Sequence, residues 1–326
     1  MRPTLPLIAR LPRAGVALVV LIASANAAAL DVALSNDDGW DSIGVQAVKR
    51  ALVAAGHRVT LAAPLDEQSG SSAAINTSGL LIRKEREDEG ALEFSVAVSG
   101  GAEGAEPATS ALVAVDIARQ RAGRLPDLLV SGTNSGANIG AFTQVSGTVG
   151  AAIVGLATTF NGSVPSIAIS TDAVCSEASE TCLARNEAHF ARVADFLVAV
   201  VAQLERKPGF LAAEPALLPP RVGLNINYPP REVPAGVRVV QQGQTAAFGG
   251  SPIILGLGCY GPCATLPVGG ALPGGITGIA ADSTNDVRDS DTAAYAMGYI
   301  TIVPISPDYT ANPAPRFRSV FSTLRF

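Results

Sequence analysis

The chain has 326 residues, of which 48% are hydrophobic and 16% are charged, and its formal net charge is −5. This size and composition predict a globular protein with a full hydrophobic core. Because the net charge is negative and no run of Lys or Arg alternates with aromatic residues, nucleic-acid binding is excluded as a main function. A small anion could still be held by local geometry.

Residues 1–29 have the layout of a secretory signal peptide. Arginines precede an apolar run at 14–25, and small residues follow, with A-x-A triplets at 25–27 and 27–29. Cleavage there would start the mature protein just before Leu30. An uncleaved membrane anchor is the alternative, but the apolar run is short for a bilayer span. We therefore expect a periplasmic or secreted protein that has no membrane contact after cleavage.

The first strand of the mature chain ends in two adjacent carboxylates. An apolar stretch from Leu30 runs into SNDDG at 35–39, which contains Asp37 and Asp38. Open α/β sheets place their ligands at the carboxyl ends of their strands. Neighbouring ionised carboxylates repel each other unless a cation, an arginine or water compensates them, so a hard metal ion is the natural partner. The alternative is that one of them only caps the next helix.

The following segments predict a parallel strand pair. Apolar residues recur at helical spacing over 43–53, and Gly56 ends this pattern. A second strand over 58–63 implies a right-handed crossover and a parallel sheet. The polar loop at 65–78 then lies at the carboxyl end of that strand and contains Ser69, which is either a ligand or a plain loop hydroxyl.

The next segments alternate between expected strands, a linker and a helix. Residues 80–98 predict strands or a hairpin, and the run SGGAEGAEP at 99–107 predicts a flexible linker. Thr109 is the expected N-cap of a helix that continues to about Arg121. A short buried strand is expected at 127–130.

Two loops rich in small polar residues follow. The run SGTNSGANIG at 131–140 holds Asn134 and Asn138, and it brings backbone amides and side-chain carbonyls close to a ligand. The loop at 144–150 opens an apolar helix at 151–156, so its amides form an anion site. Asn134 could instead be a turn residue, and Asn138 could merely shape the loop. Ser146 and Thr148 could be only a helix cap.

The rest of the chain predicts a strand at 165–170, a long helix at 186–205 and a proline-containing connector at 211–220 that closes the main domain. Beyond it, strand-like segments are separated by Gly/Pro-rich loops. We interpret this part as a smaller β-rich portion that packs across a subunit boundary.

The four cysteines form two pairs that are close in sequence, Cys175 with Cys182 and Cys259 with Cys263. In an exported protein such pairs indicate small disulfide loops. The alternative, a four-thiolate zinc site, requires both pairs to converge across a long gap.

Oxygen ligands from separate loops combine into one candidate metal site. Asp37, Asp38, Ser69 and Asn134 form an all-oxygen set suited to one divalent cation, Mg²⁺ or Mn²⁺, with Ca²⁺ as a further candidate. Beside it, phosphoryl oxygens would be bound by Asn134, Asn138, Ser146, Gly147 and Thr148. A metal bridging a phosphate held in this way can ready a water molecule for attack. The combination predicts a metal-dependent phosphatase.

The same residues resemble a known family. The chain is similar to the SurE survival-protein family of nucleotidases through SNDDG at 35–39, AP-x₄-SG at 63–70, SG-x-N-x-G-x-N-x-G at 131–140 and SGTVGAA at 146–152. The resemblance implies a Rossmann-like fold, a divalent metal held by Asp37, Asp38, Ser69 and Asn134, and hydrolysis of nucleoside 5′/3′-monophosphates. It also implies that carboxyl-terminal strands exchange between subunits of a homodimer or homotetramer.

One motif departs from the family pattern. Where the family has Gly-Thr-Pro-Ala-Asp-Cys, this chain has AEPATS at 105–110, so an Asp is lost and Glu106 is gained. We expect this change to alter substrate preference more than catalysis.

Together these observations predict an α/β protein with a Rossmann-like, mostly parallel sheet flanked by helices and a β-rich C-terminal extension. We expect a signal peptide at 1–29, a metal-phosphatase domain at 30–215 and an oligomerisation arm at 216–326. Asp37 and Asp38 are the candidate catalytic residues, with Asp37 orienting the attacking water or taking its proton. A non-catalytic exported protein that binds nucleotides or phosphate is the alternative.

Three further groups are expected to be structural. The two histidines, His57 and His189, flank a turn and a helix. The run DSDT at 289–292 follows no apolar strand, and we interpret it as a solvated turn rather than a phosphoaspartate signature.

Overall fold

The computed structural model describes most of the chain after the expected signal peptide. The described residues are 29–100, 103–157, 162–206, 216–248, 251–259, 263–271, 274–280 and 286–308. Residues 1–28 of the expected signal peptide and half of the expected connector at 211–220 lie outside them. Among the described residues, no helix is both long enough and apolar enough to cross a bilayer.

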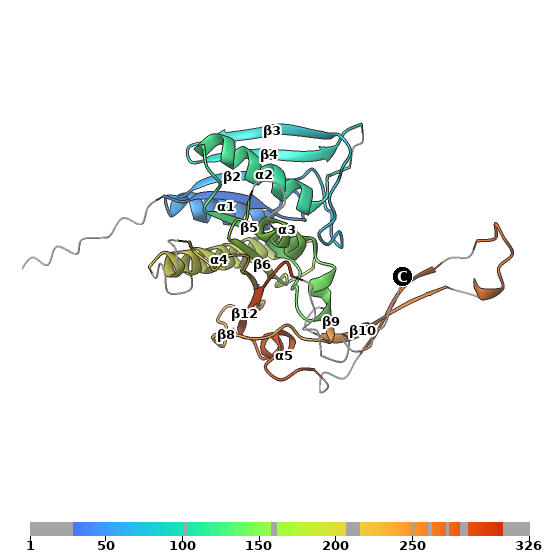
Figure 1. Ribbon diagram of the computed structural model, residues 1–326. Helices are drawn as coiled ribbons and strands as arrows, with labels where there is room; N and C mark the ends of the chain where they lie inside the picture. Colours follow the sequence, from blue (N-terminus) through green and yellow to red (C-terminus); the bar gives the residue numbers. More distant parts are fainter. Residues whose placement is uncertain are drawn as a thin grey trace, which may run out of the picture.

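A nine-stranded mixed sheet forms the centre of the protein (Figure 1). In spatial order its strands are β3 (Leu80–Asp88), β4 (Ala91–Val98), β2 (Arg58–Pro64), β1 (Asp31–Ser35), β5 (Leu128–Ser135), β6 (Ser166–Thr171), β7 (Gly223–Tyr228), β12 (Ile300–Ile305) and β8 (Val237–Val239). The run from β4 to β7 is parallel throughout, while β3 is antiparallel to β4 and β12 is antiparallel to β7. The prediction of a mostly parallel α/β sheet is therefore confirmed.

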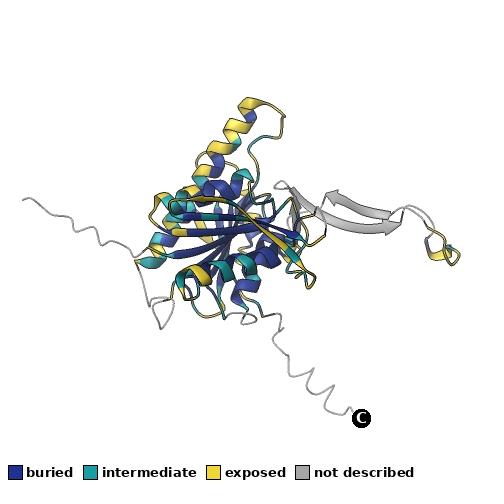
Figure 2. Ribbon diagram, turned by 90° about the horizontal axis from the view of Figure 1, so that it is seen from above, coloured by how far each residue is buried: buried dark blue, intermediate teal, exposed yellow. Residues whose placement is uncertain are grey.

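Helices cover both faces of this sheet, and the strands lie buried between them (Figure 2). Helices α1 (Ile43–Ala54) and α4 (Glu180–Glu205) pack on one face, and α2 (Pro107–Ala122) and α3 (Gly147–Leu156) pack on the other. The side chains of β1 alternate accordingly. Val32 and Leu34 join the core under α1 and α4, whereas Ala33 joins the core under α2 and α3.

The C-terminal part contributes to the main sheet and to a separate ribbon. Strands β7, β12 and β8 extend the main sheet beyond β6. A second, three-stranded antiparallel sheet of β9 (Ala246–Phe248), β10 (Ser251–Cys259) and β11 (Gly274–Ala280) projects from the main body (Figure 1). This ribbon agrees with the expected β-rich extension. Strands from both sides of the expected domain boundary, between residues 215 and 216, belong to the same sheet. The boundary itself stays a prediction.

Three expectations for the middle of the chain were wrong in detail. Helix α2 begins at Pro107 with Glu106 as N-cap, because proline suits the first helical position, so Thr109 is not the cap. The expected linker is partly ordered, since Gly104 forms a bridge with Ala97 and Ala105 is fully buried. The helices expected at 186–205 and 151–156 begin earlier, at Glu180 and Gly147.

The run DSDT at 289–292 is not a solvated turn. Ser290 caps the short helix α5 (Asp291–Ala296), and the Asp291 side chain is fully buried, although Asp289 is exposed. Tertiary contacts bury the run, and the local sequence does not indicate them.

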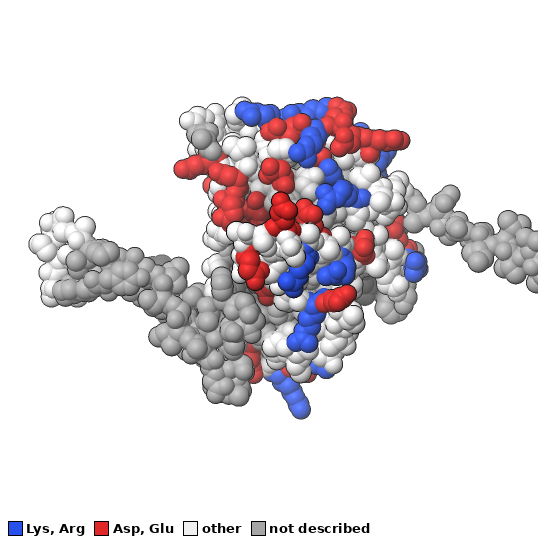
Figure 3. Space-filling view, turned by 180° about the vertical axis from the view of Figure 1, so that it is seen from behind, with Lys and Arg blue, Asp and Glu red and all other residues white. Residues whose placement is uncertain are grey.

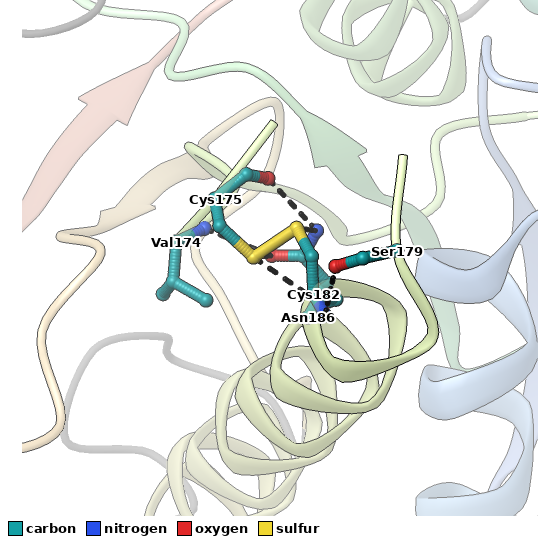
Figure 4. The surroundings of a disulfide bond; sticks show 5 residues. All are labelled: Val174, Cys175, Ser179, Cys182 and Asn186. Carbon is teal, nitrogen blue, oxygen red and sulfur yellow. Dashed lines mark hydrogen bonds between the residues drawn. A yellow bond between two sulfur atoms is a disulfide. The ribbon is translucent and has the colours of Figure 1, made fainter. Parts of the chain in front are cut away.

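A disulfide joins Cys175 and Cys182 in the loop before α4 (Figure 4). Asn186 holds this loop against α4, since its amide nitrogen donates to the Cys175 carbonyl and its amide oxygen accepts the Val174 N–H. The two sulfurs are bonded to each other, which argues against the four-thiolate zinc alternative. The side chains of Cys259 and Cys263 lie outside the description.

Charged side chains are distributed over the surface without a continuous basic field on the face seen in Figure 3. At the amino edge of the sheet, Asp31 pairs with Arg58 and with Arg124, at 2.6 and 2.9 Å. These pairs fix the start of β1 at the edge opposite the candidate site.

Candidate active site

The candidate site lies where the strand order of the sheet reverses. The chain passes from β1 outward to β2, and later returns to place β5 on the other side of β1. Crevices at such switch points, outside the carboxyl ends of the strands, are the usual ligand sites of open α/β sheets. Asp37 and Asp38 follow β1, and Asn134 lies near the end of β5.

A cavity of about 530 Å³ opens at this point. Its wall includes five of the predicted site residues: Asp37, Ser69, Asn134, Asn138 and Ser146. The volume lies within the range that small-molecule sites occupy. The structure thus brings loops that are distant in the sequence to one cavity, although Asp38, Gly147 and Thr148 are not part of its wall.

The Asp37 side chain is 3% exposed and is fixed by the first turn of α3. The Thr148 hydroxyl donates to one carboxylate oxygen at 2.6 Å, and the Thr148 N–H donates to the other at 3.1 Å. Gly147 permits this approach, because a Cβ there would lie 2.9 Å from an Asp37 oxygen. Burial raises the pKa of Asp37, and the Thr148 hydrogen bonds offset part of that rise.

Asp38 reaches the edge of the same site through β5. Its carboxylate accepts the Ser135 N–H at 2.9 Å, and Ser135 lines the cavity. Burial and the adjacent charge of Asp37 raise the pKa of Asp38 to about 7. In the described part of the cavity wall, no Lys or Arg compensates the charge of these two carboxylates.

Ser69 and Asn134 supply neutral oxygens to the cavity. The exposed Ser69 lies in a loop whose backbone is held by the Glu67 carboxylate, which accepts the Ser69 N–H. The amide nitrogen of Asn134 donates to the Gly136 carbonyl at 2.6 Å. This bond leaves the amide oxygen of Asn134 as the group that a cation could use.

The start of α3 is partly committed to protein contacts. The Ser146 hydroxyl caps the helix by accepting the Val149 N–H, and both donors of Thr148 serve Asp37. The Gly147 N–H is then the first-turn donor that no described group accepts, and it could bind an anion. The Asn138 amide nitrogen donates to Ser170 and Thr148, so this side chain also helps to shape the wall.

A divalent cation fits these donors. The predicted set provides two carboxylates, a hydroxyl and an amide oxygen, which is the chemistry that Mg²⁺ and Mn²⁺ prefer. Both carboxylates have raised pKa values, and no Lys or Arg belongs to the described cavity wall. A cation at this point would supply the missing positive charge. The assignment of individual ligands stays a prediction.

Sequence reasoning missed part of the wall, namely Phe142, Val145, Asp172 and Ala173. A signal for Asp172 was present. It lies directly after β6, just as Asp37 lies shortly after β1, and both strands end at the same edge of the sheet. Phe142 and Val145 lie in or beside the 3₁₀ helix η1 (Ala141–Gln144), which no sequence pattern had indicated, and Ala173 follows Asp172 after β6.

A second layer of polar residues supports the glycine-rich loop. From β7, Asn227 accepts the Asn138 N–H at 2.7 Å, and Asn225 donates to the Asn138 carbonyl at 2.9 Å. From α5, Asp291 accepts the N–H groups of Gly140 and Gly243. Elements after residue 216, the strand β7 and the helix α5, therefore support the loop that carries Asn138.

Both histidines are structural, as expected. His57 is 6% exposed and accepts the Leu30 N–H, and His189 is fully buried against Thr171. Neither belongs to the cavity wall.

Comparison with known proteins agrees with this geometry. The sequence model of the family described as "Survival protein SurE" matches residues 32–248, which is more than half of the chain. The chain belongs to the SurE family.

Individual SurE proteins match over much of their length. A protein named 5′-nucleotidase SurE from Solidesulfovibrio magneticus is 33% identical over 204 residues, covering 62% of this chain and 66% of the relative. A protein of the same name from Gloeobacter violaceus is 31% identical over 287 residues, which cover 86% of this chain and 92% of the relative. The crystal structure of a SurE protein from Aquifex aeolicus superimposes with a TM-score of 0.63 at 24% identity, covering 89% of this chain and 99% of that chain. This likeness shows a common fold.

Proposed function

We propose that this protein is a divalent-metal-dependent phosphomonoesterase that hydrolyses nucleoside 5′/3′-monophosphates and related phosphomonoesters. The observation that carries the proposal is the buried Asp37 carboxylate, with the partly buried Asp38 next to it in the sequence, at a switch-point cavity that Ser69 and Asn134 also line. Membership of the SurE family, and relatives that carry the name 5′-nucleotidase, support the same activity.

In this proposal Asp37, Asp38, Ser69 and Asn134 hold the cation, with Mg²⁺ or Mn²⁺ ahead of Ca²⁺. When bound, the cation polarises the phosphate and lowers the pKa of a water molecule. The phosphoryl oxygens are bound by Ser146 and the adjacent Gly147 N–H at the start of α3 and by Asn138 from the glycine-rich loop, since Ser146 and Asn138 line the same cavity as Asp37. Thr148 holds Asp37 in a single orientation, from which it directs the attacking water or accepts its proton.

We further propose that the protein is exported and acts in the periplasm or outside the cell. The arginine-rich start, the apolar run at 14–25 and the alanine-rich exit support export. The Cys175–Cys182 disulfide is typical of an oxidising compartment. We also propose a homodimer or homotetramer, supported by the ribbon β9–β10–β11 that projects from the main body.

The test is metal-dependent release of inorganic phosphate. Protein treated with a chelator should not release phosphate from adenosine 5′-monophosphate or p-nitrophenyl phosphate, and added Mn²⁺ or Mg²⁺ should restore release. Asp37→Asn should lower kcat by about 100-fold or more, since the residue lies at the reacting phosphate. Asp195→Asn, an exposed carboxylate on α4, is the matched control and should retain full activity.

One outcome would replace the proposal. Saturable binding of the nucleotide with no phosphate release under any metal condition would identify a non-catalytic binding protein with the same cavity.

A further inference from the structure

The proposed metal and phosphate sites leave one carboxylate of the cavity wall, Asp172, without an assigned role. Asp172, directly after β6, lines the cavity together with Ala173, Phe142 and Val145. The phosphate and cation groups come from the loops after β1, β2 and β5 and from the start of α3. Asp172 therefore borders the remaining space, which the alcohol part of a phosphomonoester would occupy.

Two hydrogen bonds from different elements fix the Asp172 carboxylate. The Ala137 N–H, from the glycine-rich loop, donates to one oxygen at 2.9 Å. The Tyr295 hydroxyl, from α5, donates to the other oxygen at 2.9 Å. Tyr295 is 4% exposed, and burial and the charge of Asp172 raise its pKa, so it keeps its proton and acts as the donor.

The carboxylate retains unused acceptor capacity on the cavity side. An ionised carboxylate can accept about four hydrogen bonds. The Asp172 carboxylate accepts two from protein groups, one from the Ala137 N–H and one from the Tyr295 hydroxyl. The Asp172 side chain is only partly buried, and its position in the cavity wall exposes it to a bound molecule. Hydroxyl groups of a substrate can use these positions.

The charges around the cavity add a second effect. The described wall contains no Lys or Arg. A cation held by Asp37 and Asp38 would neutralise those two carboxylates but not Asp172. A second phosphate near Asp172 would meet a like charge without a compensating partner. A neutral group rich in hydroxyls would meet a fixed acceptor.

We propose that Asp172, held by Tyr295 and Ala137, is a specificity-determining residue that selects substrates whose alcohol part is neutral and carries hydroxyl donors, as in a nucleoside monophosphate. It disfavours substrates that carry a second phosphate. The inference depends on the proposed phosphatase activity and specifies its substrate class.

The first measurement compares adenosine 5′-monophosphate with adenosine 3′,5′-bisphosphate by initial rates of phosphate release with Mn²⁺. Wild-type protein should prefer the monophosphate. Asp172→Asn should raise kcat/KM for the bisphosphate relative to the monophosphate by about tenfold, because the repelling charge is gone. Asp195→Asn makes the same change in net charge on exposed α4 and should leave the ratio unchanged.

The second measurement separates hydrogen bonding from charge. In wild-type protein, kcat/KM for the 2′,3′-dideoxy analogue of the monophosphate should be about tenfold lower than for the ribonucleotide. Asp172→Asn should reduce this difference in kcat/KM. Tyr295→Phe keeps the Asp172 charge but removes its anchor. It should reduce the difference in kcat/KM between the ribonucleotide and its dideoxy analogue. The ratio of kcat/KM between the bisphosphate and the monophosphate should stay near the wild-type value.

Failure of this inference differs from failure of the proposed function. If Asp172→Asn folds, releases phosphate and keeps the wild-type ratios for both pairs of substrates, Asp172 does not determine specificity and the phosphatase assignment stands. If Asp172→Asn does not fold, Tyr295→Phe decides the question. A wild-type ratio of kcat/KM between the ribonucleotide and its dideoxy analogue in Tyr295→Phe would then overturn the inference. No phosphate release by the wild-type protein under any metal condition would instead overturn the proposed function.

Discussion

Thr148 donates both its hydroxyl and its backbone N–H to the two carboxylate oxygens of Asp37, at 2.6 and 3.1 Å. The carboxylate that follows β1 is thereby oriented by the first turn of α3. Catalytic groups act efficiently only when their geometry is held within narrow limits. The alignment of β1 with α3 is therefore part of the site.

Thr148→Val should reduce activity without unfolding the protein. The valine keeps the shape and the backbone N–H but removes the hydroxyl bond to Asp37. We expect kcat to fall by about tenfold, since a hydrogen bond to a charged group contributes about 1.5–3 kcal/mol. Steady-state kinetics with saturating Mn²⁺ test this expectation, and Thr148→Ser, which restores the hydroxyl, should recover most of the rate. Equal rates for the valine and serine variants would contradict it.

Gly147→Ala should disturb the same junction by steric conflict. A Cβ at this position would lie 2.9 Å from an Asp37 oxygen and 2.9 Å from the Pro107 side chain. Overpacking of this kind costs about 1–3 kcal/mol, so thermal unfolding should shift to lower temperature. The fall in kcat, expressed as a free energy, should exceed the loss in the free energy of unfolding, because Asp37 must move away from its position. An alanine variant with wild-type kcat would show that the helix start tolerates displacement.

Asp291→Ala should destabilise the C-terminal part of the fold and weaken substrate binding. The buried Asp291 carboxylate accepts N–H groups from Gly140, Gly243 and Thr292, and alanine would leave them without partners. We expect a loss of about 3 kcal/mol in the free energy of unfolding. Because Gly140 ends the loop that carries Asn138, KM should also rise. Denaturant unfolding and kinetics test both effects, with the exposed Asp195→Ala as control.

His189 should make stability depend on acid. Burial, with a smaller contribution from Arg192 and partial opposition from Asp172, lowers the pKa of His189 to about 4. Between pH 6.5 and 4 the unfolded chain binds a proton that the folded protein does not bind. The contribution of His189 is thus fully present above pH 6.5 and decreases as the pH falls toward 4, by at most about 1.4 kcal/mol per pH unit.

Comparison with His189→Gln isolates this contribution from that of other groups. The raised pKa values of Asp37 and Asp38 act in the opposite direction, since protonation of those carboxylates favours the folded state. Denaturant unfolding at pH 7 and at pH 5 should show a smaller difference between wild type and variant at the lower pH. A difference that does not change with pH would mean that His189 has the same pKa in the folded and the unfolded protein.

The sequence predicted those site residues that lie just after an apolar strand. Asp37 follows β1, Ser69 lies in the loop after β2 and Asn134 lies at the end of β5, and a parallel sheet brings these strand ends together. Asp172 met the same criterion but was overlooked, because a single carboxylate before a cysteine-containing loop has no motif around it.

Other features depend on tertiary contacts that no local pattern encodes. The bonds between Thr148 and Asp37 depend on how closely α3 approaches β1. The sequence indicates a solvated turn at DSDT because no apolar strand precedes it, yet the Asp291 carboxylate accepts the backbone N–H groups of residues 140 and 243. The start of α2 was misplaced because threonine is a preferred N-cap residue and glutamate is not, whereas the proline at 107 marks the first helical position.

The ion pairs of Asp31 with Arg58 and Arg124 lie at the first residue of β1, where the chain enters the sheet. The chain enters at the amino edge of β1, whereas the cavity opens at the carboxyl edge. A carrier protein or solid support attached ahead of Leu30 would therefore leave the cavity mouth facing the medium. Immobilised protein should turn over dissolved nucleotides as freely as the untethered form.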